Sequence, residues 1–435
     1  MKNNPKVDSR QLALKVLQSV IDKKESLSSA IPFHFSAELS TKDKAFAQML
    51  VYGVLRRYWR LMAILPLLMK KKLKDKDSDI QIILLMALFQ LMETRVPDYA
   101  SVDASVNLCR KQKKKWAAGM VNAVLRNFIR QQQELMQKID NKPQAKYDHP
   151  QWMIDRLRKD WPENWEAIFA QNNQQASMAL RVNQQQLSVD DFALKLNTKL
   201  NESAEQYDTG VVLNHPRDVS ELPGFEEGWF SVQDMGAQQA ATLLDLHTEQ
   251  NVLDCCAAPG GKTCHMLEIE PTLNMLALDV SDQRLMRVQE NLERLQLSAE
   301  LMAADASQPD EWSEGRQFDR ILLDVPCSAS GVIRRHPDIK LLRRKQDIPA
   351  LIEIQQKILQ KIWPLLVSGG KLLYATCSVF KDENENQLEQ FLQQQQDAVE
   401  IKIAANWGHE RPHGRQIFPG DDDMDGFYYA LLQKK

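Results

Sequence analysis

Two cysteines stand directly after apolar runs that have the length of buried strands. Cys327 follows the run 321–323 and the acid Asp324. Cys377 follows the run 372–375. The ends of parallel strands are where open α/β folds carry catalytic groups, and a thiol there can act as a nucleophile once it loses its proton. The competing interpretation of any single cysteine is a small buried hydrophobic residue.

The other four cysteines fit that second interpretation. Cys109 and Cys264 lie in helix-like segments, and Cys255 and Cys256 lie at a strand end, where the backbone of Cys256 is expected near a ligand. No two cysteines have the C-x2-C or C-x4-C spacing of a zinc site, so we expect no metal. Six cysteines at irregular intervals also argue against a disulfide framework and favour a reducing, cytoplasmic location.

Residues 252–263 read Val-Leu-Asp-Cys-Cys-Ala-Ala-Pro-Gly-Gly-Lys-Thr. This order predicts a buried strand, a tight glycine turn and a helix whose N-terminus faces a ligand. A loop that binds a nucleoside triphosphate would need a glycine at the position of Cys256. The G-x-G-x-x-G turn of a dehydrogenase is also absent, so a dehydrogenase is the least favoured class. S-adenosylmethionine is the third candidate, because it has no phosphate but presents a ribose, an adenine and an amino acid.

Acids follow the strand-like runs in series. Asp279 ends a run about twenty residues after the glycines, the spacing at which an acid reaches ribose hydroxyls. Asp305 and Asp324 follow two further runs, and Asp254 closes the run before the turn. Four such acids favour one edge of a parallel sheet as the ligand site. The alternative is that each acid caps the helix that follows it.

The chain is long enough to need several domains to hold these groups. Its 435 residues exceed the ~250–300 that one core usually serves. A hydrophobic content of 43% with 26% charged residues is typical of a soluble globular protein. No apolar run reaches the ~18–20 residues that span a bilayer, and the first residues lack the apolar run of a signal peptide, so we expect no membrane partner.

Charge is divided unevenly along the chain. Residues 1–140 hold 25 basic and 13 acidic side chains, a net charge of +12, which leaves −15 for the remainder. Basic residues gather in 56–60, 70–74 and 110–116, and aromatic residues accompany two of these runs. The excess favours contact with RNA phosphates, although a solvated helix face is the usual meaning of a lysine run.

The pattern of elements predicts three regions. Residues 1–140 show helical spacing almost throughout. Residues 141–230 are predicted to form a linker and a small α+β subdomain. The polar composition extends the predicted linker back over 131–150. In the subdomain, Arg181 could meet a phosphate. Residues 231–435 alternate strand and helix regularly, as in a doubly wound sheet.

The motifs in 254–263, 324–328 and 375–378 together resemble those of the RNA (cytosine-5) methyltransferases of the Sun/Fmu family. The likeness extends to 331–338 and 425–430 and covers essentially the whole chain. In addition, 50–57 and 121–126 resemble the all-helical RNA-binding fold of NusB. The resemblance implies an all-α NusB-like RNA-binding domain, a small α+β subdomain and a C-terminal α/β Rossmann-like, doubly wound methyltransferase domain.

The resemblance also assigns roles to residues. Cys377 would be the nucleophile that adds to carbon 6 of cytosine, Cys327 would assist release of the product, and Asp324 would hold the amino group and protonated nitrogen of the base. Asp279 would bind the ribose hydroxyls of S-adenosylmethionine, and Asp305 would lie near its adenine amine. The remaining contacts to this cofactor would come from Asp324 and from Cys256, Ala257, Ala258, Pro259, Gly260, Gly261 and Lys262.

The implied reaction is methylation of carbon 5 of one cytosine in small-subunit ribosomal RNA by an enzyme expected to be a monomer. The same reaction on transfer RNA is the close alternative, and only the NusB-like region favours the ribosomal target. A non-catalytic RNA-binding or assembly factor is an alternative from another class. The presence of both cysteines and all four acids argues against it.

Overall fold

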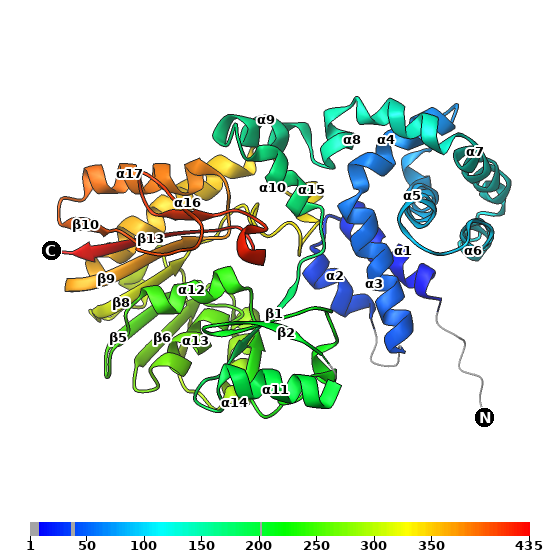
Figure 1. The fold of residues 1–435 in the computed structure, drawn as a ribbon. Coiled ribbons are helices and arrows are strands. Elements are labelled where there is room, and N and C mark those ends of the chain that lie inside the picture. Colours follow the sequence, from blue (N-terminus) through cyan, green and yellow to red (C-terminus); the bar gives the residue numbers. More distant parts are fainter. Residues whose placement is uncertain (1–7, 36–39, 201) are drawn as a thin grey trace. The chain divides into compact units, whose positions relative to one another are not determined.

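A computed structural model describes residues 8–35, 40–200 and 202–435 (Figure 1). The chain divides into two compact units. The first comprises 1–174 together with 333–345, and the second comprises 175–332 together with 346–435. The second unit contains every residue of the predicted catalytic and cofactor site. The domain limits at 140 and 230 remain a prediction, separate from this division into two units.

The first unit is all helical. Its apolar centre is α5, whose residues from Ile80 to Phe89 are buried except Gln81, because this helix is hydrophobic on all sides. The amphipathic α7 covers it with one apolar stripe, which includes Val121, Leu125 and Phe128. The helices are α1 (Ser9–Ile21), α2 (Leu27–His34), α3 (Thr41–Arg56), α4 (Tyr58–Leu68), α5 (Ser78–Glu93), α6 (Asp98–Lys111), α7 (Lys115–Asp140), α8 (Pro143–Tyr147), α9 (Gln151–Asp160), α10 (Trp165–Asn172) and α15 (Ile339–Leu342).

The prediction of a linker over 131–150 is wrong. Residues 131–140 form the last turns of α7, and Leu135 and Ile139 are buried in the helical core. Asp148 and His149, which follow α8, are also buried. The polar composition of this stretch reflects the exposed face of an amphipathic helix rather than a flexible connection.

Residues 333–345 are an excursion from the second unit into the first. The Asp338 carboxylate accepts the N–H of Leu27 at 2.9 Å. The buried Lys340 donates to the carbonyl of Arg56 at 2.6 Å and to Asn173 at 3.0 Å. Burial lowers the pKa of Lys340 to about 7. Thirteen residues that follow the Pro-Cys motif in sequence are therefore part of the helical unit.

The second unit begins with a small antiparallel sheet in the order β2-β3-β1-β4. Its strands are β1 (Met178–Val182), β2 (Ala204–Tyr207), β3 (Gly210–Leu213) and β4 (Phe230–Val232). The helix α11 (Val189–Leu200) packs on it through Phe192 and Leu196, which meet Phe230 in one apolar cluster. This is the predicted α+β subdomain.

A larger sheet of nine of the described strands follows. Its order is β11-β12-β13-β9-β8-β5-β6-β7, with β10 paired to β13. The run from β9 to β7 is parallel, and β13 is antiparallel to β9. The strands are β5 (Asn251–Cys255), β6 (Asn274–Asp279), β7 (Glu300–Ala303), β8 (Phe318–Asp324), β9 (Leu366–Thr376), β10 (Ala398–Ile401), β11 (His409–Glu410), β12 (Arg415–Ile417) and β13 (Phe427–Lys434).

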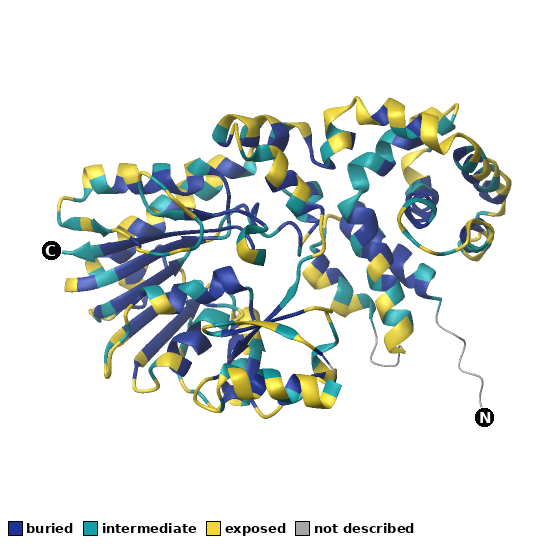
Figure 2. Cartoon of the chain, in the orientation of Figure 1, coloured by how far each residue is buried: buried dark blue, intermediate teal, exposed yellow. Residues whose placement is uncertain are grey.

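Helices cover both faces of the larger sheet (Figure 1). One face packs against α12 (Met235–Leu243), α13 (Gly261–Ile269) and α14 (Asp282–Leu295), and the other against α16 (Asp347–Ile362) and α17 (Glu385–Gln394). Alternate residues of each strand enter the two cores, so Leu322 faces one side while Ile321 and Leu323 face the other. The central strands are accordingly buried, and the outward faces of the helices are exposed (Figure 2). The doubly wound arrangement is as predicted, but the regular alternation of strand and helix does not run to 435, because β10 to β13 follow one another without an α-helix and pair antiparallel.

The helices of the described residues do not combine the length and the apolar character required to cross a bilayer.

Candidate active site

Parallel pairing brings the predicted acids and thiols to one edge of the sheet. Strand β5 lies between β6 and β8, with Cys255 opposite Leu278 and Leu323, and β8 pairs with β9 so that Asp324 is opposite Ala375. The chain leaves β5 toward β6 on one side, while β8 and β9 lie on the other. This change of direction is the switch point at which open α/β sheets bind ligands.

The glycine turn depends on backbone conformations that few residues adopt. Cys256 has a φ of 64° and Gly260 a φ of 93°. A Cβ on Gly260 would lie 2.9 Å from the Val288 side chain, so this position requires glycine. Helix α13 then begins at Gly261 without a side-chain cap, which leaves its first N–H groups directed at the turn.

The acids at the turn are held by backbone donors. The Asp279 carboxylate, whose side chain is 1% exposed, accepts the N–H of Ala258 at 3.3 Å and of Ser281 at 3.1 Å, and it pairs with Arg284 at 3.2 Å. Asp305 lies in the loop after β7, is exposed, and accepts the N–H of Ser307 at 2.8 Å. Both predicted acids therefore lie at the carboxyl edge.

Asp254 is a buried acid behind the turn. One of its oxygens accepts the Thr263 hydroxyl at 2.6 Å, while its buried Oδ1 has no hydrogen-bond partner among the described residues. Burial raises the pKa of Asp254 to about 7, although the bond from Thr263 opposes this. The Asp254 Oδ1 and the neighbouring carboxylates are acceptors, which suit hydroxyl and ammonium groups of a ligand. The uncapped N–H groups of α13 are donors, which suit a carboxylate of the same ligand.

Asp254→Asn should change how stability depends on pH. The folded-state pKa near 7 lies above the unfolded value of 3.8, so the wild type loses stability as pH rises from about 4 through 7. The free energy of unfolding of the variant relative to wild type should therefore increase by about 2 kcal/mol between pH 5 and pH 8. Urea unfolding at both pH values measures this difference. The exposed control Asp310→Asn should show none, and an equal response of both variants would contradict the prediction.

Lys262 and Asp324 form an ion pair at the centre of the edge. The Lys262 Nζ lies 2.5 Å from Asp324 Oδ2 and 5.2 Å from the centre of the Phe427 ring. Burial acts to lower the pKa of Lys262, but the Asp324 carboxylate outweighs it and the net pKa is raised. The lysine therefore stays charged. This pairing was not predicted, because the two residues are far apart in the sequence.

The two thiols are in contact. The Cys327 Sγ lies 3.4 Å from the Cys377 Sγ, and both residues are partly exposed. The hydrogen bond with Cys377 and then burial raise the pKa of Cys327 well above its ordinary value. Either sulfur can be the donor in this contact, so the geometry brings the two thiols together without ranking them.

One buried carboxylate connects the loops that carry the thiols. Glu383 accepts the N–H of Ser328 at 2.8 Å and the hydroxyl of Ser378 at 2.5 Å, and Gln355 donates to it at 3.1 Å. Each serine follows one of the two cysteines in sequence. Glu383 was not predicted from the sequence. The serine that follows each cysteine was the only feature that pointed to a shared partner.

The motifs that follow Cys327 and close the chain also meet here. The N–H of Gly331 donates to the Cys377 carbonyl at 2.9 Å, and the N–H of Gly426 donates to the Gly331 carbonyl at 2.8 Å. A Cβ on Gly331 would lie 2.2 Å from the Gly426 carbonyl oxygen, which explains why both positions are glycine.

Two expectations about basic residues are wrong or only partly right. Arg181 meets no phosphate, because its side chain is fully buried and paired with Glu268. In the run 56–60, Arg57 and Arg60 pair with acids of the helical unit. The lysines of the other two runs are mostly exposed, although Lys111 and Lys114 also pair with acids of the helical unit, and Trp116 is 58% exposed. These two runs remain the candidate RNA-facing surface.

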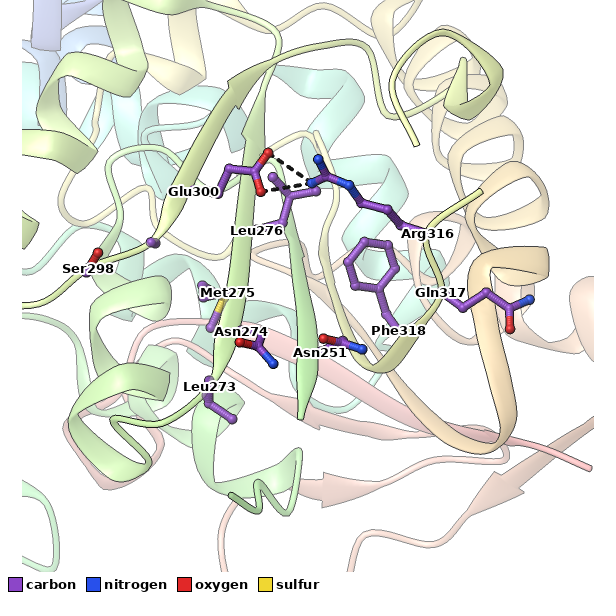
Figure 3. A pocket seen from close by; sticks show the side chains of 11 residues that line it. Asn251, Leu273, Asn274, Met275, Leu276, Ser298, Glu300, Arg316, Gln317 and Phe318 are labelled. Carbon is purple, nitrogen blue, oxygen red and sulfur yellow. Dashed lines mark hydrogen bonds and ion pairs between the residues drawn. The ribbon is translucent and has the colours of Figure 1, made fainter. Parts of the chain in front are cut away.

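A cavity of about 470 Å³ lies at the opposite edge of the sheet (Figure 3). It is lined by the amino ends of β5 to β8, including Asn251, Asn274 and Phe318, and by the ion pair of Arg316 with Glu300. No predicted site residue lines it. The carboxyl edge that carries the predicted site residues and this cavity are therefore distinct places.

Known proteins and family models match this chain over nearly its whole length. The family model described as 16S rRNA methyltransferase RsmB/F matches 241–433, the NusB family model matches 7–130, and the ferredoxin-like domain of RsmF/B-like methyltransferases matches 149–220. The ribosomal RNA small subunit methyltransferase B of Pseudomonas putida is 46% identical over 98% of this chain and 99% of its own. The protein of the same name from Escherichia coli is 43% identical over 98% of both chains.

Solved structures share the fold. PH0851 superposes with a TM-score of 0.81 at 20% identity, covering 98% of this chain and 99% of its own. NSun6 from Pyrococcus horikoshii with SFG gives a TM-score of 0.58 at 20% identity, over 66% of this chain and 98% of its own.

Proposed function

This chain belongs to the RsmB/F family of 16S rRNA methyltransferases, and from that premise we propose that it methylates carbon 5 of one cytosine in 16S rRNA through a covalent adduct on Cys377. It is a methyltransferase that acts on ribosomal RNA with S-adenosylmethionine as cofactor. The observation that carries the finer proposal is the contact of two thiols, at 3.4 Å, beside the Lys262–Asp324 pair.

The cofactor would be held by the glycine turn from Cys256 to Lys262, with Asp279 on its ribose and Asp305 toward its adenine. The unpartnered oxygen of Asp254 and the uncapped start of α13 support this placement. When bound, the cofactor supplies an electrophilic methyl group from its sulfonium.

The first task of the protein is to activate a poor nucleophile. Carbon 5 of cytosine does not attack a methyl donor until a thiolate has added to carbon 6, which forms an S–C6 bond and makes carbon 5 enamine-like. Cys377 is the sulfur proposed for this step, because its motif after β9 resembles that of the family nucleophile and its Sγ lies beside the Cys327 Sγ, at 3.4 Å. Asp324 would hold the amino group and protonated nitrogen of the base, and the ion pair with Lys262 keeps the Asp324 side chain in place.

The second task is release. After methylation the proton on carbon 5 must leave, the C5–C6 double bond re-forms, and the S–C6 bond breaks to return the Cys377 thiolate. The Cys327 thiol then gives its own proton to solvent, which its partial exposure permits, and the thiolate accepts the proton from carbon 5.

The helical unit is proposed to bind ribosomal RNA through its exposed lysines, and the enzyme is expected to act as a monomer in the cytoplasm. Bisulfite sequencing of 16S rRNA and transfer RNA, from cells with and without the gene, tests the substrate. We expect one cytosine of 16S rRNA to lose its modification and regain it on complementation. Loss confined to transfer RNA would move the reaction to that substrate, and no change in either would contradict the proposal.

A further inference from the structure

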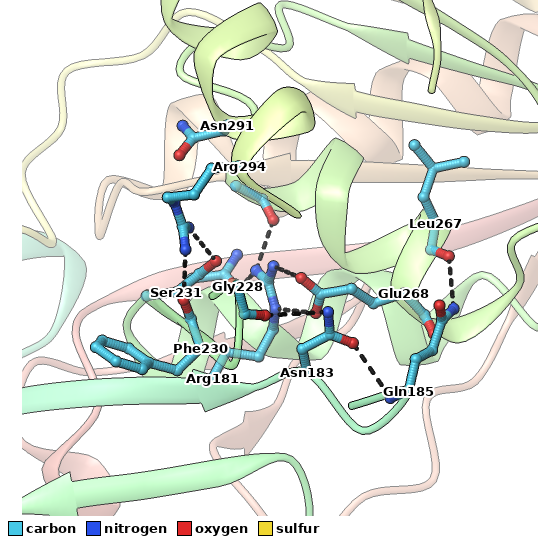
Figure 4. Close-up of polar contacts among 12 residues, drawn as sticks. Arg181, Asn183, Gln185, Gly228, Phe230, Ser231, Leu267, Glu268, Asn291 and Arg294 are labelled. Carbon is cyan, nitrogen blue, oxygen red and sulfur yellow. Dashed lines mark hydrogen bonds and ion pairs between the residues drawn. The ribbon is translucent and has the colours of Figure 1, made fainter. Parts of the chain in front are cut away.

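Arg181 is a buried arginine on β1 that reaches across to the helix after the glycine turn. Its Nε and Nη2 donate to the two carboxylate oxygens of Glu268 at 2.7 and 2.6 Å (Figure 4). Its Nη1 donates to the carbonyl of Gly261 at 2.7 Å and to the side chain of Gln233. The side chain is fully buried, so no solvent competes for these bonds.

The bond to Gly261 lies at the cofactor turn itself. Gly261 is the first residue of α13 and directly follows Gly260, whose φ of 93° closes the turn. The Gln233 amide lies 3.6 Å from where a Cβ on Gly261 would stand. The fork of Arg181 therefore fixes the carbonyl of the first residue of α13, while the N–H groups of this turn, which have no side-chain cap, are left for a ligand.

The small sheet also holds the far end of α13. Gln185, three residues after β1, donates to the carbonyls of Leu267 and Glu268 at 3.2 and 2.7 Å (Figure 4). On the other side of the turn, Asn291 of α14 donates to the Pro259 carbonyl at 3.0 Å. Arg294 of the same helix donates to the Phe230 carbonyl in β4 at 3.0 Å. The small sheet therefore supports both helices that flank the turn.

An ion pair between Arg181 and Glu268 alone would only join the small sheet to α13. The hydrogen bond from Arg181 to the Gly261 carbonyl is not needed for that ion pair, because two N–H groups already satisfy the Glu268 carboxylate. We propose that Arg181 is a positioning residue for S-adenosylmethionine, which fixes the start of α13 so that the turn and its N–H groups are arranged before the cofactor binds. This inference rests on the proposed place of the cofactor at the turn.

Two variants separate positioning from stability. Arg181→Lys keeps a positive charge beside Glu268 but cannot also serve Gly261 and Gln233. The double variant Arg181→Met with Glu268→Met removes both charges, a change that buried ion pairs often tolerate. Arg316→Lys is the matched control, since Arg316 pairs with Glu300 at the opposite edge of the sheet (Figure 3). Asp279→Asn is the control for the cofactor site.

Calorimetric titration with S-adenosylhomocysteine, without RNA, gives the dissociation constant, and thermal unfolding gives the stability of each variant. We expect the dissociation constant to rise about tenfold in both Arg181 variants, as for the loss of a charged hydrogen bond, with the midpoint of unfolding within a few degrees of wild type. Affinity for RNA and the Arg316→Lys control should be unchanged.

Unchanged affinity in both Arg181 variants, with weakened binding in Asp279→Asn, would overturn this inference and leave the cofactor site standing. Unchanged affinity in all three variants would overturn both. If neither Arg181 variant unfolds cooperatively, Arg181 serves general folding and the inference also fails.

Discussion

Cys377→Ala is expected to abolish methylation of ribosomal RNA, with a rate reduced by a factor on the order of 10⁴ or more. Without the Sγ no thiolate can add to carbon 6, and carbon 5 remains a poor nucleophile however well the base and cofactor are held. The neighbouring Cys327 does not replace it, because the Cys327 sulfur lies 3.4 Å from the position of the missing Sγ and is proposed to serve in release. Transfer of tritium from methyl-labelled S-adenosylmethionine to 16S rRNA measures the loss.

The same variant should bind S-adenosylhomocysteine as the wild type does, since the turn and Asp279 do not depend on the Cys377 side chain. Cys109→Ala in the helical unit is the matched cysteine control and should keep its activity. Turnover by Cys377→Ala within tenfold of wild type would place the nucleophile elsewhere.

Cys327→Ala is expected to trap enzyme and RNA as a covalent adduct. Addition by Cys377 would still occur, but the removal of the proton from carbon 5, and with it the breaking of the S–C6 bond, would lose its assisting group. General acid–base assistance contributes about 10²–10⁴-fold, so release should slow by that factor while addition continues. A denaturing gel of the variant with 16S rRNA and cofactor should show a slowly migrating species.

The double variant with Cys327→Ala and Cys377→Ala is the control, because it lacks the sulfur that forms the adduct. The slow species should be absent from it and should disappear from the single variant after ribonuclease treatment. A Cys327→Ala enzyme that turns over normally and gives no adduct would remove Cys327 from the release step.

The arrangement of the thiol loops would let both cysteines act on one base, as proposed. They follow adjacent parallel strands, and Glu383 binds both loops through Ser328 and Ser378. A rigid carboxylate behind the two loops keeps the sulfurs in contact without either being part of a regular element. The Lys262–Asp324 pair supplies the charges on the neighbouring strand ends.

Local patterns in the sequence were enough to predict the elements around the site. The apolar runs before Asp279, Asp324 and Cys377 end where the strands end, and the Pro-Gly-Gly turn leads into α13. Period-two and helical spacing are properties of neighbouring residues, and strand ends at one edge follow from parallel connection. The fold class was predictable for the same reason.

Polar residues were harder to interpret from the sequence. The stretch 131–150 was expected to be a linker because it is polar, yet Leu135 and Ile139 bury one face of a helix. The excursion 333–345 into the helical unit had no local signal. The burial of Lys340 depends on Arg56 and Asn173, which are remote in the chain.

The sequence by itself determined which residues reach the sheet edge, because hydrophobic periodicity and chain connection are local properties. Only the tertiary structure decided which side chains meet there, including two that the sequence did not place at the site: Cys327 contacts Cys377, Lys262 pairs with Asp324, Glu383 binds two loops, and Arg181 binds the start of α13. A buried polar group is stable only with a hydrogen-bond partner, and that partner is chosen by three-dimensional packing rather than by distance along the chain.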